Sequence, residues 1–433
     1  MNRALCVCLS LSCLFLARPA FAQRDLEIPI QFDFINPGAR SLALSGAFIG
    51  LADDATAAST NPAGLVQLAR PEVSVEGRGW EFVTAFVEGG RLSGPVTNMG
   101  IDTVSGPVFG ETTERVGGLS FLSFVYPYKQ WRFAGYRQEA SRLKSTAATQ
   151  GAFFVDFDDR GVLSHFREFP SKVNRQLDVI NYGGTAAFRA GIVSVGFGVH
   201  FSQLDYDSTL EGFELPPDFF SSAAYTNERF SGVQTGDDTG VGFSLGALVI
   251  PSRYVQFGFS YRRNATFDFE GALDYPLIPA ISGPYTGEFK VPDNIGGGVA
   301  VRPLEGLLVA FDVNRVTYSD LTEFIQKGVR FHPEEAPLYN IDDATELHLG
   351  VEYVLTRVNV LPAMRIGVWR ETEHAVTYSG ENELYLATAS LAKDITHVSF
   401  GGGIAPSPKF EFNAGFDFSD RANTMSFSAI FRF

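Results

Sequence analysis

Residues 409–418 read KFEFNAGFDF, a stretch in which apolar and polar residues alternate one by one. On an extended chain one side would carry Phe410, Phe412, Ala414, Phe416 and Phe418, and the other Lys409, Glu411, Asn413, Gly415 and Asp417. A period of two residues is the pattern of a β-strand whose faces meet different environments. We therefore predict a strand here with one apolar and one polar face.

The same alternation recurs along the chain from residue 72 onward. It is seen in VQFGFSYRR at 255–263, in TELHLGVEY at 345–353 and from Val193 to Phe201. The fourteen strands predicted from this pattern cover residues 72–90, 116–126, 131–142, 175–189, 192–208, 238–250, 254–270, 287–302, 306–318, 345–356, 362–372, 395–405, 409–419 and 423–433. The fold class is therefore all-β.

The two faces and the connections favour a transmembrane antiparallel β-barrel over a soluble sandwich. The apolar face is rich in Phe and Val and the polar face in charges and glycines, as expected with lipid outside and a polar or plugged lumen inside. Short turns, such as 303–305 and 406–408, alternate with long loops, apart from the last connection near 420–422. This asymmetry is typical of outer-membrane barrels. An even strand number places both barrel ends on the short-turn, periplasmic rim, and the chain ends in Phe433.

One residue conflicts with this pattern. Arg263 falls on the lipid-facing side, between Tyr261 and Phe267, where a charge is costly. Either Arg263 lies at the outer interface and extends towards the lipid head groups, or a local bulge shifts the alternation.

Composition and the N-terminus exclude several other classes of protein. The formal net charge of −15 argues against a nucleic-acid partner, because phosphates require a basic surface. Residues 1–22 form a predicted signal peptide with an apolar core and the cleavage site Ala20-Phe21-Ala22, so we expect export to the outer membrane of a Gram-negative bacterium. All three cysteines, Cys6, Cys8 and Cys13, lie inside it, which excludes disulfides and thiolate metal sites from the mature chain.

A glycine- and alanine-rich segment precedes the first strand. Residues 45–65 read SGAFIGLADDATAASTNPAGL and follow NPGARSLALSG. The pieces Ala52-Asp53-Asp54-Ala55 and Asn61-Pro62-Ala63-Gly64-Leu65 resemble the N-terminal segment of FadL-type outer-membrane transporters, the OMPP1/FadL/TodX family. The resemblance implies a hatch over residues 23–70 inside a 14-stranded barrel over residues 71–433. The hatch residues would be Asp53, Asp54, Asn61, Pro62, Ala63 and Gly64.

The predicted hatch has a local helix pattern. Asp53 or Asp54 can cap a short helix through DDATAAS or occupy its first turn, where the helix dipole favours a carboxylate. Asn61 tolerates a left-handed position at the helix end, and Pro62 cannot continue the helix. An ordinary capped surface helix is the alternative.

The resemblance also implies a transport mechanism. A hydrophobic compound, such as a long-chain fatty acid or a hydrocarbon, would be caught between extracellular loops and pass to a lumenal pocket. It would leave sideways through the wall after the hatch rearranges. The chain would be a monomer surrounded by outer-membrane lipid and lipopolysaccharide. No cofactor is implied, and the sequence shows neither a nucleophile–base set nor metal-ligand spacing, so we do not expect an enzyme.

Two loops and the lumen offer candidate ligand contacts. Loop residues 211–230 and 271–285 contain the apolar candidates Phe213, Leu215, Phe219, Phe220, Leu273, Leu277, Ile278 and Ile281. Contiguous exposed apolar surface usually marks a binding site, although these side chains could instead pack on one another as a cap. In the lumen a carboxylate ligand needs a cation beside apolar walls, and alternation turns Arg262, Arg365, Arg137, Leu122 and Phe124 inward. Structural ion pairs between wall and hatch are the alternative for these arginines.

A protein-secretion component is the competing prediction. Outer-membrane shuttle proteins of the type IX secretion system share a 14-strand barrel and a similar Gly-Ala-Arg front segment, and they bind a protein partner. The complete Asn-Pro-Ala-Gly-Leu and the two apolar loops favour the transporter. A porin is disfavoured by the hatch, and an outer-membrane enzyme by the missing catalytic set.

Overall fold

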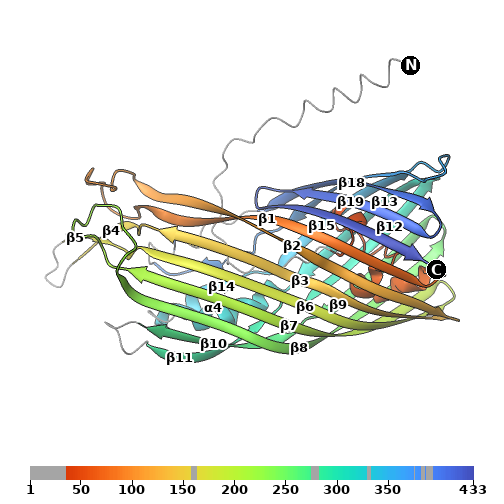
Figure 1. The fold of residues 1–433 in the computed structure, drawn as a ribbon, viewed down its shortest axis with the longest axis horizontal. Helices are drawn as coiled ribbons and strands as arrows, with labels where there is room; N and C mark the ends of the chain where they lie inside the picture. The colour runs from red at the N-terminus through yellow and green to blue at the C-terminus, as the bar shows by residue number, and fades with distance from the viewer. Residues whose placement is uncertain are drawn as a thin grey trace, which may run out of the picture.

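The computed structural model is an elongated antiparallel β-barrel (Figure 1). It describes residues 36–157, 163–274, 282–328, 333–374, 376–381, 386 and 394–433. The predicted signal peptide therefore lies outside the described residues, as do Leu277, Ile278 and Ile281. No helix in this described part is both long and apolar enough to cross a membrane.

Fourteen wall strands follow one another around the barrel in chain order. Twelve are unbroken: β1 (Glu72–Arg91), β2 (Gly106–Tyr128), β3 (Trp131–Thr149), β6 (Ser171–Ala190), β7 (Val193–Phe213), β8 (Glu228–Ser252), β13 (Leu307–Val316), β15 (Ala344–Val354), β16 (Ala363–Glu371), β18 (Ile395–Ser407), β19 (Phe410–Phe418) and β20 (Ala422–Arg432). Two are broken in the middle, into β9 (Val255–Arg263) with β10 (Thr266–Asp274), and β11 (Gly283–Lys290) with β12 (Asn294–Leu304). Because β1 pairs with both β2 and β20, the wall is closed, and the predicted all-β barrel is confirmed.

Several strands extend further than predicted on the long-loop rim. β2 begins at Gly106 instead of residue 116, and β8 begins at Glu228 instead of residue 238. These extensions are rich in polar residues, as in GETTER at 110–115, so the alternation that marks the lipid-facing part fades there.

The long loops carry short elements of their own. The β3–β6 connection contains the hairpin β4 (Phe153–Phe157) and β5 (Leu163–Arg167). The β13–β15 connection contains η3 (Tyr318–Leu321), α4 (Thr322–Gly328), η4 (Pro333–Leu338) and β14 (Tyr339–Ile341). β14 pairs with β17 (Val376–Tyr378) from the next long loop, so two loops are joined above the wall.

The wall has an apolar outside and a mostly polar inside over its lower half. On β7, Phe197 and Phe201 are 50% and 63% exposed, whereas Ser202, the next residue along the same strand, is buried. The exposed fractions of the side chains also correct one prediction on β2. Leu122 and Phe124 are exposed and face outward, and the lumenal residues are their neighbours, including Phe121. Alternation identifies two faces, but without a reference it does not say which face is the lumen.

The break between β9 and β10 shifts the alternation by one residue. Arg263 is exposed at the end of β9, but Phe267 is buried inside the barrel instead of facing lipid. Across the break, Asn264 donates its side-chain amide to Pro292 O at 2.6 Å, at the matching break between β11 and β12. Arg263 itself stays on the outward side with Phe257 and Phe259, and the shift in alternation begins directly after it.

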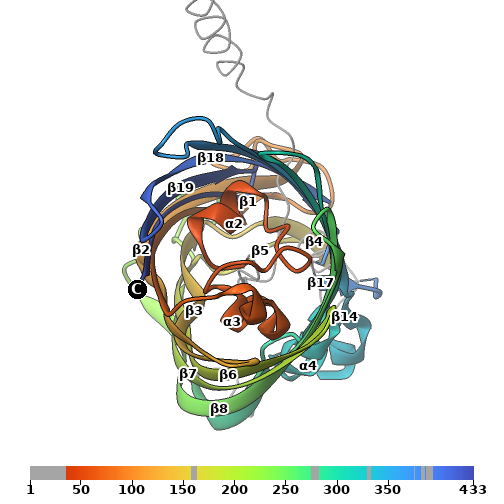
Figure 2. The ribbon, with the colours of Figure 1, turned by 90° about the vertical axis from the view of Figure 1, so that its right-hand side faces the viewer.

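An N-terminal segment lies inside the barrel, as Figure 2 shows for its helices. This inner segment, residues 36–68, contains α2 (Ala39–Ala43), α3 (Ala57–Thr60) and the 3₁₀ helix η1 (Pro62–Gln67). Nearly all of its residues are buried. It occupies the end of the barrel with the short turns, which is the end where the C-terminus lies (Figure 1).

The helix signals of the inner segment act differently from the prediction. The N-cap of α3 is Thr56, and Asp54 accepts the Thr56 N–H at 2.9 Å ahead of the helix. Asn61 is extended, with φ −143°, and not left-handed. Its side chain accepts the Ala63 N–H, so Asn61-Pro62 begins η1 as well as ending α3.

Wall glycines make room for the inner segment. A Cβ on Gly258 would lie 2.1 Å from Ile49 O, and one on Gly196 would lie 2.4 Å from Ala63 N. A Cβ on Gly401 would lie 2.6 Å from the Ala43 side chain. The inner segment therefore rests on the wall at backbone distance, which no larger residue permits.

We expect Gly258→Ala to dislodge the inner segment, because overpacking of this kind costs about 1–3 kcal/mol. The measurement is single-channel conductance in planar bilayers, which should rise as the lumen opens. Gly184→Ala is the matched control, since a Cβ there meets no atom within 4 Å. Equal conductance of the two variants would contradict the prediction.

Candidate functional site

Arg40 holds the inner segment to the wall. Its guanidinium donates to both carboxylate oxygens of Glu352 on β15, at 2.8 and 2.9 Å, and to Asp53 at 2.6 Å. Asp53 is bound in turn by Arg302 at 3.2 Å, and Glu352 by Arg365 at 2.6 Å. Two predicted residues, Asp53 and Arg365, thus belong to one buried ion network between inner segment and wall.

Two more contacts hold the inner segment on other sides of the lumen. On β1, Glu72 accepts the Ala55 N–H at 2.9 Å. On β13, Asp312 accepts the Ile49 N–H at 2.6 Å. Wall carboxylates, which are strong acceptors, thereby satisfy backbone N–H groups of the inner segment that lie between its short helices.

A stack of aromatic rings supports the inner segment near Ser45. Trp369 lies between His348 and His397, with ring centroids 5.2 and 3.8 Å away. His348 Nδ1 lies 2.6 Å from Ser45 O, and His397 Nδ1 lies 2.7 Å from an oxygen of Asp417. In the described ranges no group of three or more His, Cys, Asp or Glu residues is arranged to hold a metal ion.

Above the inner segment the lumen is lined by apolar side chains. This upper cluster consists of Leu143, Leu177, Val179, Leu204, Tyr206, Ala265, Phe267, Phe269, Phe289, Val291, Val316, Tyr318, Leu321, Ile341 and Ala344. Phe324 of α4 packs edge-on against Phe269 and Phe289. The shift in alternation after Arg263 is what turns Phe267 and Phe269 into this cluster.

A small lumenal cavity lies between the upper cluster and the inner segment. It is lined by Gln138, Ala140, Val179, Asn181, Ser202, Arg262, Asn264, Ala265 and Val291, three of which also belong to the upper cluster. Its free volume, about 10 Å³ for the centre of a water-sized sphere, is enough for about one water. Arg262 donates to Ser59 O of the inner segment, and Ser260 donates to Thr60 O at 2.6 Å.

The polar side of this cavity contains groups with unused hydrogen-bonding capacity. Gln138 Oε1 is buried and has no hydrogen-bond partner among the described residues. The same holds for both ring nitrogens of the neighbouring wall residue His200. Arg262 forms no ion pair with a carboxylate of the described residues, and its hydrogen bond goes to the Ser59 main-chain oxygen.

The wall is incompletely paired directly outside this cavity. β2 and β3 pair only from Tyr128↔Trp131 to Phe121↔Gln138. Beyond that point β2 pairs with β1 alone and β3 with β6 alone, leaving a seam between residues 106–120 and 139–149. Side chains bridge it: Arg142 donates to Gly117 O at 3.0 Å, and Arg137 donates to Leu119 O. Arg137 is therefore a seam residue on the outer side, not the lumenal residue that alternation predicted.

The loop candidates pack on one another at the long-loop rim. Phe219 and Phe220 lie against Phe153 of β4, with ring centroids 5.7 and 5.6 Å away. Phe213 meets Tyr225 edge-on at 5.4 Å. In a separate place, Leu273 lies on β10 opposite Gly232 of β8, and Leu215 is half-buried in the β7–β8 loop.

A buried ion pair closes the first long loop, next to these aromatic rings. Arg91 donates to both oxygens of Asp102, at 2.9 and 2.5 Å, and Thr97 donates to Asp102 twice. Burial alone would raise the pKa of Asp102, but the bonds from Arg91 and Thr97 outweigh it and lower the pKa to about 2.

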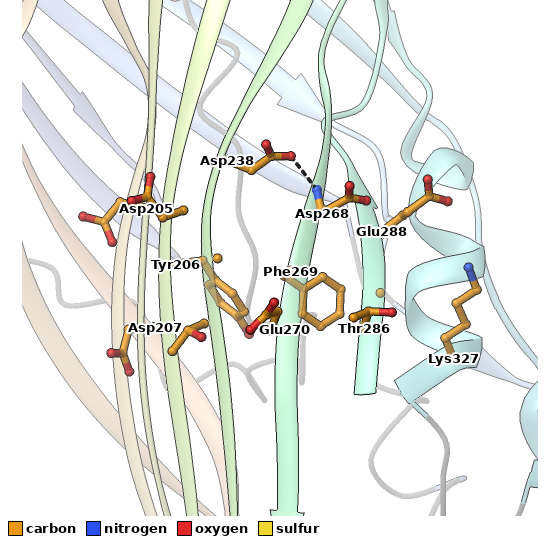
Figure 3. Close-up of a pocket in the computed structure, with 14 residues that line it drawn as sticks. Asp205, Tyr206, Asp207, Asp238, Asp268, Phe269, Glu270, Thr286, Glu288 and Lys327 are labelled. Atoms are coloured by element: carbon orange, nitrogen blue, oxygen red, sulfur yellow. Dashed lines mark hydrogen bonds between the residues drawn. The ribbon is translucent and has the colours of Figure 1, made fainter. Parts of the chain in front are cut away.

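An acidic groove of about 870 Å³ is lined by residues of β7, β8, β10, β11 and α4 (Figure 3). Its charged lining is Asp205, Asp207, Asp237, Asp238, Asp268, Glu270, Glu288 and Lys327. Asp205 and Asp207 lie on the same face of β7 as the lipid-facing Phe201. Tyr206 and Phe269 of the upper cluster also line the groove, but its many charged side chains do not suit a hydrophobic ligand.

Sequence reasoning missed the upper cluster and the seam. The signal for the cluster was Pro292, a residue that a central strand does not tolerate without a break. The signal for the seam was Arg137. It is paired with the outward-facing Leu122, which places a charged residue on the outer face of the wall. Neither signal is decisive without the register between strands.

Comparisons with known proteins agree with this architecture. The family described as outer membrane protein transport protein (OMPP1/FadL/TodX) matches residues 162–423. A FadL homologue of Pseudomonas aeruginosa is similar with a TM-score of 0.62 at 13% identity, covering 95% of this chain and 100% of that one. The toluene transporters TbuX of Ralstonia pickettii and TodX of P. putida each give 0.56, at 16% and 13% identity, covering 93% of this chain and 99% of theirs. At these identities the similarity shows the fold. A search of curated proteins finds no match.

We expect Arg40→Met to release the inner segment. Breaking an unshared buried ion pair typically costs about 3–5 kcal/mol, and here the cost should be smaller, because Arg302 and Arg365 stay on Asp53 and Glu352. Single-channel conductance should rise and become unsteady, while the barrel still assembles. Arg115→Met is the control, because its pair with Glu81 is largely exposed and contributes little. A conductance unchanged from the wild type would argue against Arg40 as the fastening point.

The Arg91–Asp102 pair predicts an acid-sensitive loop. Because the pKa of Asp102 is lowered from 3.8 to about 2, the pair stabilises the loop fully above about pH 4 and is lost as the pH falls through about 2. Pepsin should therefore cleave residues 92–105 faster as the pH is lowered across this range. Asp102→Asn should be cleaved rapidly already at pH 4, whereas Asp205→Asn should behave as wild type; a resistant Asp102→Asn would refute the assignment.

Proposed function

Because the chain belongs to the OMPP1/FadL/TodX family of outer membrane transport proteins, we propose that it takes up hydrophobic compounds through the lumen described above. The barrel lies in the outer membrane, and the fold is that of the family's transporters. The inner segment acts as the hatch, with Asp53, Asp54 and Asn61 to Gly64 as its fastening and folding residues. The proposed boundaries remain residues 23–70 for the hatch and 71–433 for the barrel.

One observation supports this proposal most strongly: the sequence of environments along the lumen. A ligand that enters at the long-loop rim meets the apolar upper cluster first and the lumenal cavity next. The inner segment closes the way down to the periplasmic rim. The seam, in contrast, opens beside the cavity, because Gln138 both lines the cavity and forms the last pair of the β2–β3 ladder.

We propose that the seam is the exit. Leu119 and Leu122 beside it are 43% and 42% exposed on the lipid-facing side. An apolar compound that leaves here moves from the apolar lumen into lipid and never crosses water, which suits its low solubility. A water-filled pore would offer no such gain.

Arg262 supports an acidic head group on the compound. It lies at the polar end of the cavity beneath the upper cluster, and no carboxylate in the described part of the chain forms an ion pair with it. A long-chain fatty acid would place its acyl chain along the upper cluster and its carboxylate at Arg262, with Gln138 and Asn181 near. Phe213, Leu215, Phe219, Phe220 and Leu273 remain candidates for first capture, as do Leu277, Ile278 and Ile281. Arg365 is the weaker lumenal candidate, because Glu352 and Asn413 already occupy it.

The proposed surroundings are outer-membrane lipid and lipopolysaccharide around a single copy of the chain. The exposed Phe, Val and Leu side chains of the wall support lipid contact. The family assignment favours transport over the secretion alternative, in which the barrel would bind a protein partner.

The function is tested by uptake of labelled palmitic acid and of the fatty alcohol of equal chain length into cells that carry the protein. Arg262→Met should lower uptake of the acid about 10- to 100-fold, the worth of one charge-assisted hydrogen bond, and leave the alcohol nearly unchanged. Equal loss for both compounds would mean that Arg262 serves only to hold Ser59. Mass spectrometry of compounds co-purified with the wild type provides the second readout. Recovery of a bound secreted protein without lipid would favour the secretion alternative.

A further inference from the structure

Two β-bulges lie at the height where the seam begins. On β2, Ser120 is an extra residue opposite β1, and on β3, Ala140 is an extra residue opposite β6. The last β2–β3 pair, Phe121↔Gln138, lies next to Ser120 and two residues from Ala140. Because a bulge bends its strand and interrupts regular pairing, the two strands part at a built-in position.

The N-terminal end of the inner segment is fastened at the same height. Glu76 of β1 accepts the Gly38 N–H at 2.7 Å, Arg78 Nε at 2.9 Å and the Ser426 hydroxyl at 2.5 Å. Arg78 also donates to Asn36 O at 3.1 Å. The Glu76 carboxylate is fully buried, so its charge depends on these partners.

The same two residues also contact the seam. The Ser120 hydroxyl donates to the main-chain oxygen of Glu76 at 3.3 Å, at the β2 bulge itself. Glu139 is the first β3 residue beyond the ladder. Its ion-pair partner Arg142 lies beside Gly118 of β2, where a Cβ would be 2.6 Å from Arg142 Nη1, and Gly118 is the residue that pairs with Arg78. One face of the Glu76–Arg78 pair therefore holds the inner segment and the other meets the seam.

Glu139 is the least satisfied carboxylate at this place. Its side chain is fully buried, with Arg142 at 3.0 Å and Arg137 at 3.8 Å. Neither carboxylate oxygen makes a hydrogen bond among the described residues. Arg137 and Arg142 are also the residues that hold β2 carbonyls across the seam.

We propose that Glu76 and Arg78 couple the inner segment to the seam, so that release of one opens the other. When Asn36 and Gly38 withdraw, Arg78 loses an acceptor and Glu76 loses a donor. Arg78 keeps its bond to Glu76 but has lost one acceptor, and the buried Glu139 carboxylate, neither oxygen of which makes a hydrogen bond among the described residues, can take that place. Pairing with Arg78 draws Glu139 away from Arg137 and Arg142, and their hold on β2 weakens. The coupling itself does not depend on the proposed function; only its role, to open the exit when the hatch is released, rests on that function.

The coupling is tested by measuring the width of the seam without any ligand. The mature chain has no cysteine, since all three lie within residues 1–22, so Arg115→Cys and Lys144→Cys place two nitroxide labels cleanly. These exposed residues lie on β2 and β3, on opposite sides of the seam. Glu76→Gln in the full mature chain should shift the label-to-label distance to longer values and broaden its distribution. Adding Arg78→Gln should return the distance to that of the wild type, because the competing cation is gone.

Glu72→Gln is the matched control. Glu72 is a buried carboxylate on the same strand that also holds the inner segment, but it lies where β1, β2 and β3 are fully paired. It should leave the distance unchanged. An unchanged distance in Glu76→Gln, or an equal shift in Glu72→Gln, overturns the coupling. If Glu76→Gln does not assemble, as judged by heat-dependent migration on gels, a chain without residues 23–38 must shift the distance in the same direction. A shift in a protein that takes up neither acid nor alcohol would refute the proposed function and leave the coupling standing.

Discussion

The bond between Arg40 and Glu352 is the interaction on which the lumen depends. A segment packed inside a barrel loses bulk water on every side, so each of its charges needs a fixed partner. Arg40 meets this condition with both oxygens of Glu352 and one of Asp53. Arg365 and Arg302 then balance those two carboxylates from the wall. The wall thus selects one position for the inner segment, and the space above that position is left to apolar side chains.

Strand alternation predicted the barrel well because lipid and lumen place opposite demands on neighbouring residues. In KFEFNAGFDF the phenylalanines of β19 face outward and Asn413 and Asp417 are buried inside, as the pattern requires. The prediction was weaker wherever one of those demands disappears. Beyond the membrane both faces are polar, so the starts of β2 and β8 were placed too late. On β2 the pattern separated the two faces, but Leu122 and Phe124 were assigned to the lumen instead of the lipid. Both faces are apolar there, so polarity does not distinguish them.

The candidate site was less predictable, because it depends on register between strands distant in sequence. The inner segment was identified from Asn61-Pro62-Ala63-Gly64, although the family match covers residues 162–423 and not this stretch. The lumenal position of Arg262 and Arg365 followed from alternation. The seam did not, because bulges at Ser120 and Ala140 leave no mark in a sequence where serine and alanine are common. The aromatic loop residues were noticed for their composition, but their packing on Phe153 depends on a hairpin from another loop.

The glycines that face the inner segment leave the lower lumen without wall side chains at those positions. In a barrel filled by its own side chains, removing any one element leaves neighbours that can relax into the space. Here Gly196, Gly258 and Gly401 have no side chains that could move into the space, because residues 36–68 fill the lumen at those positions. A wall made without that segment would therefore keep a wide, hydrated bore of fixed shape.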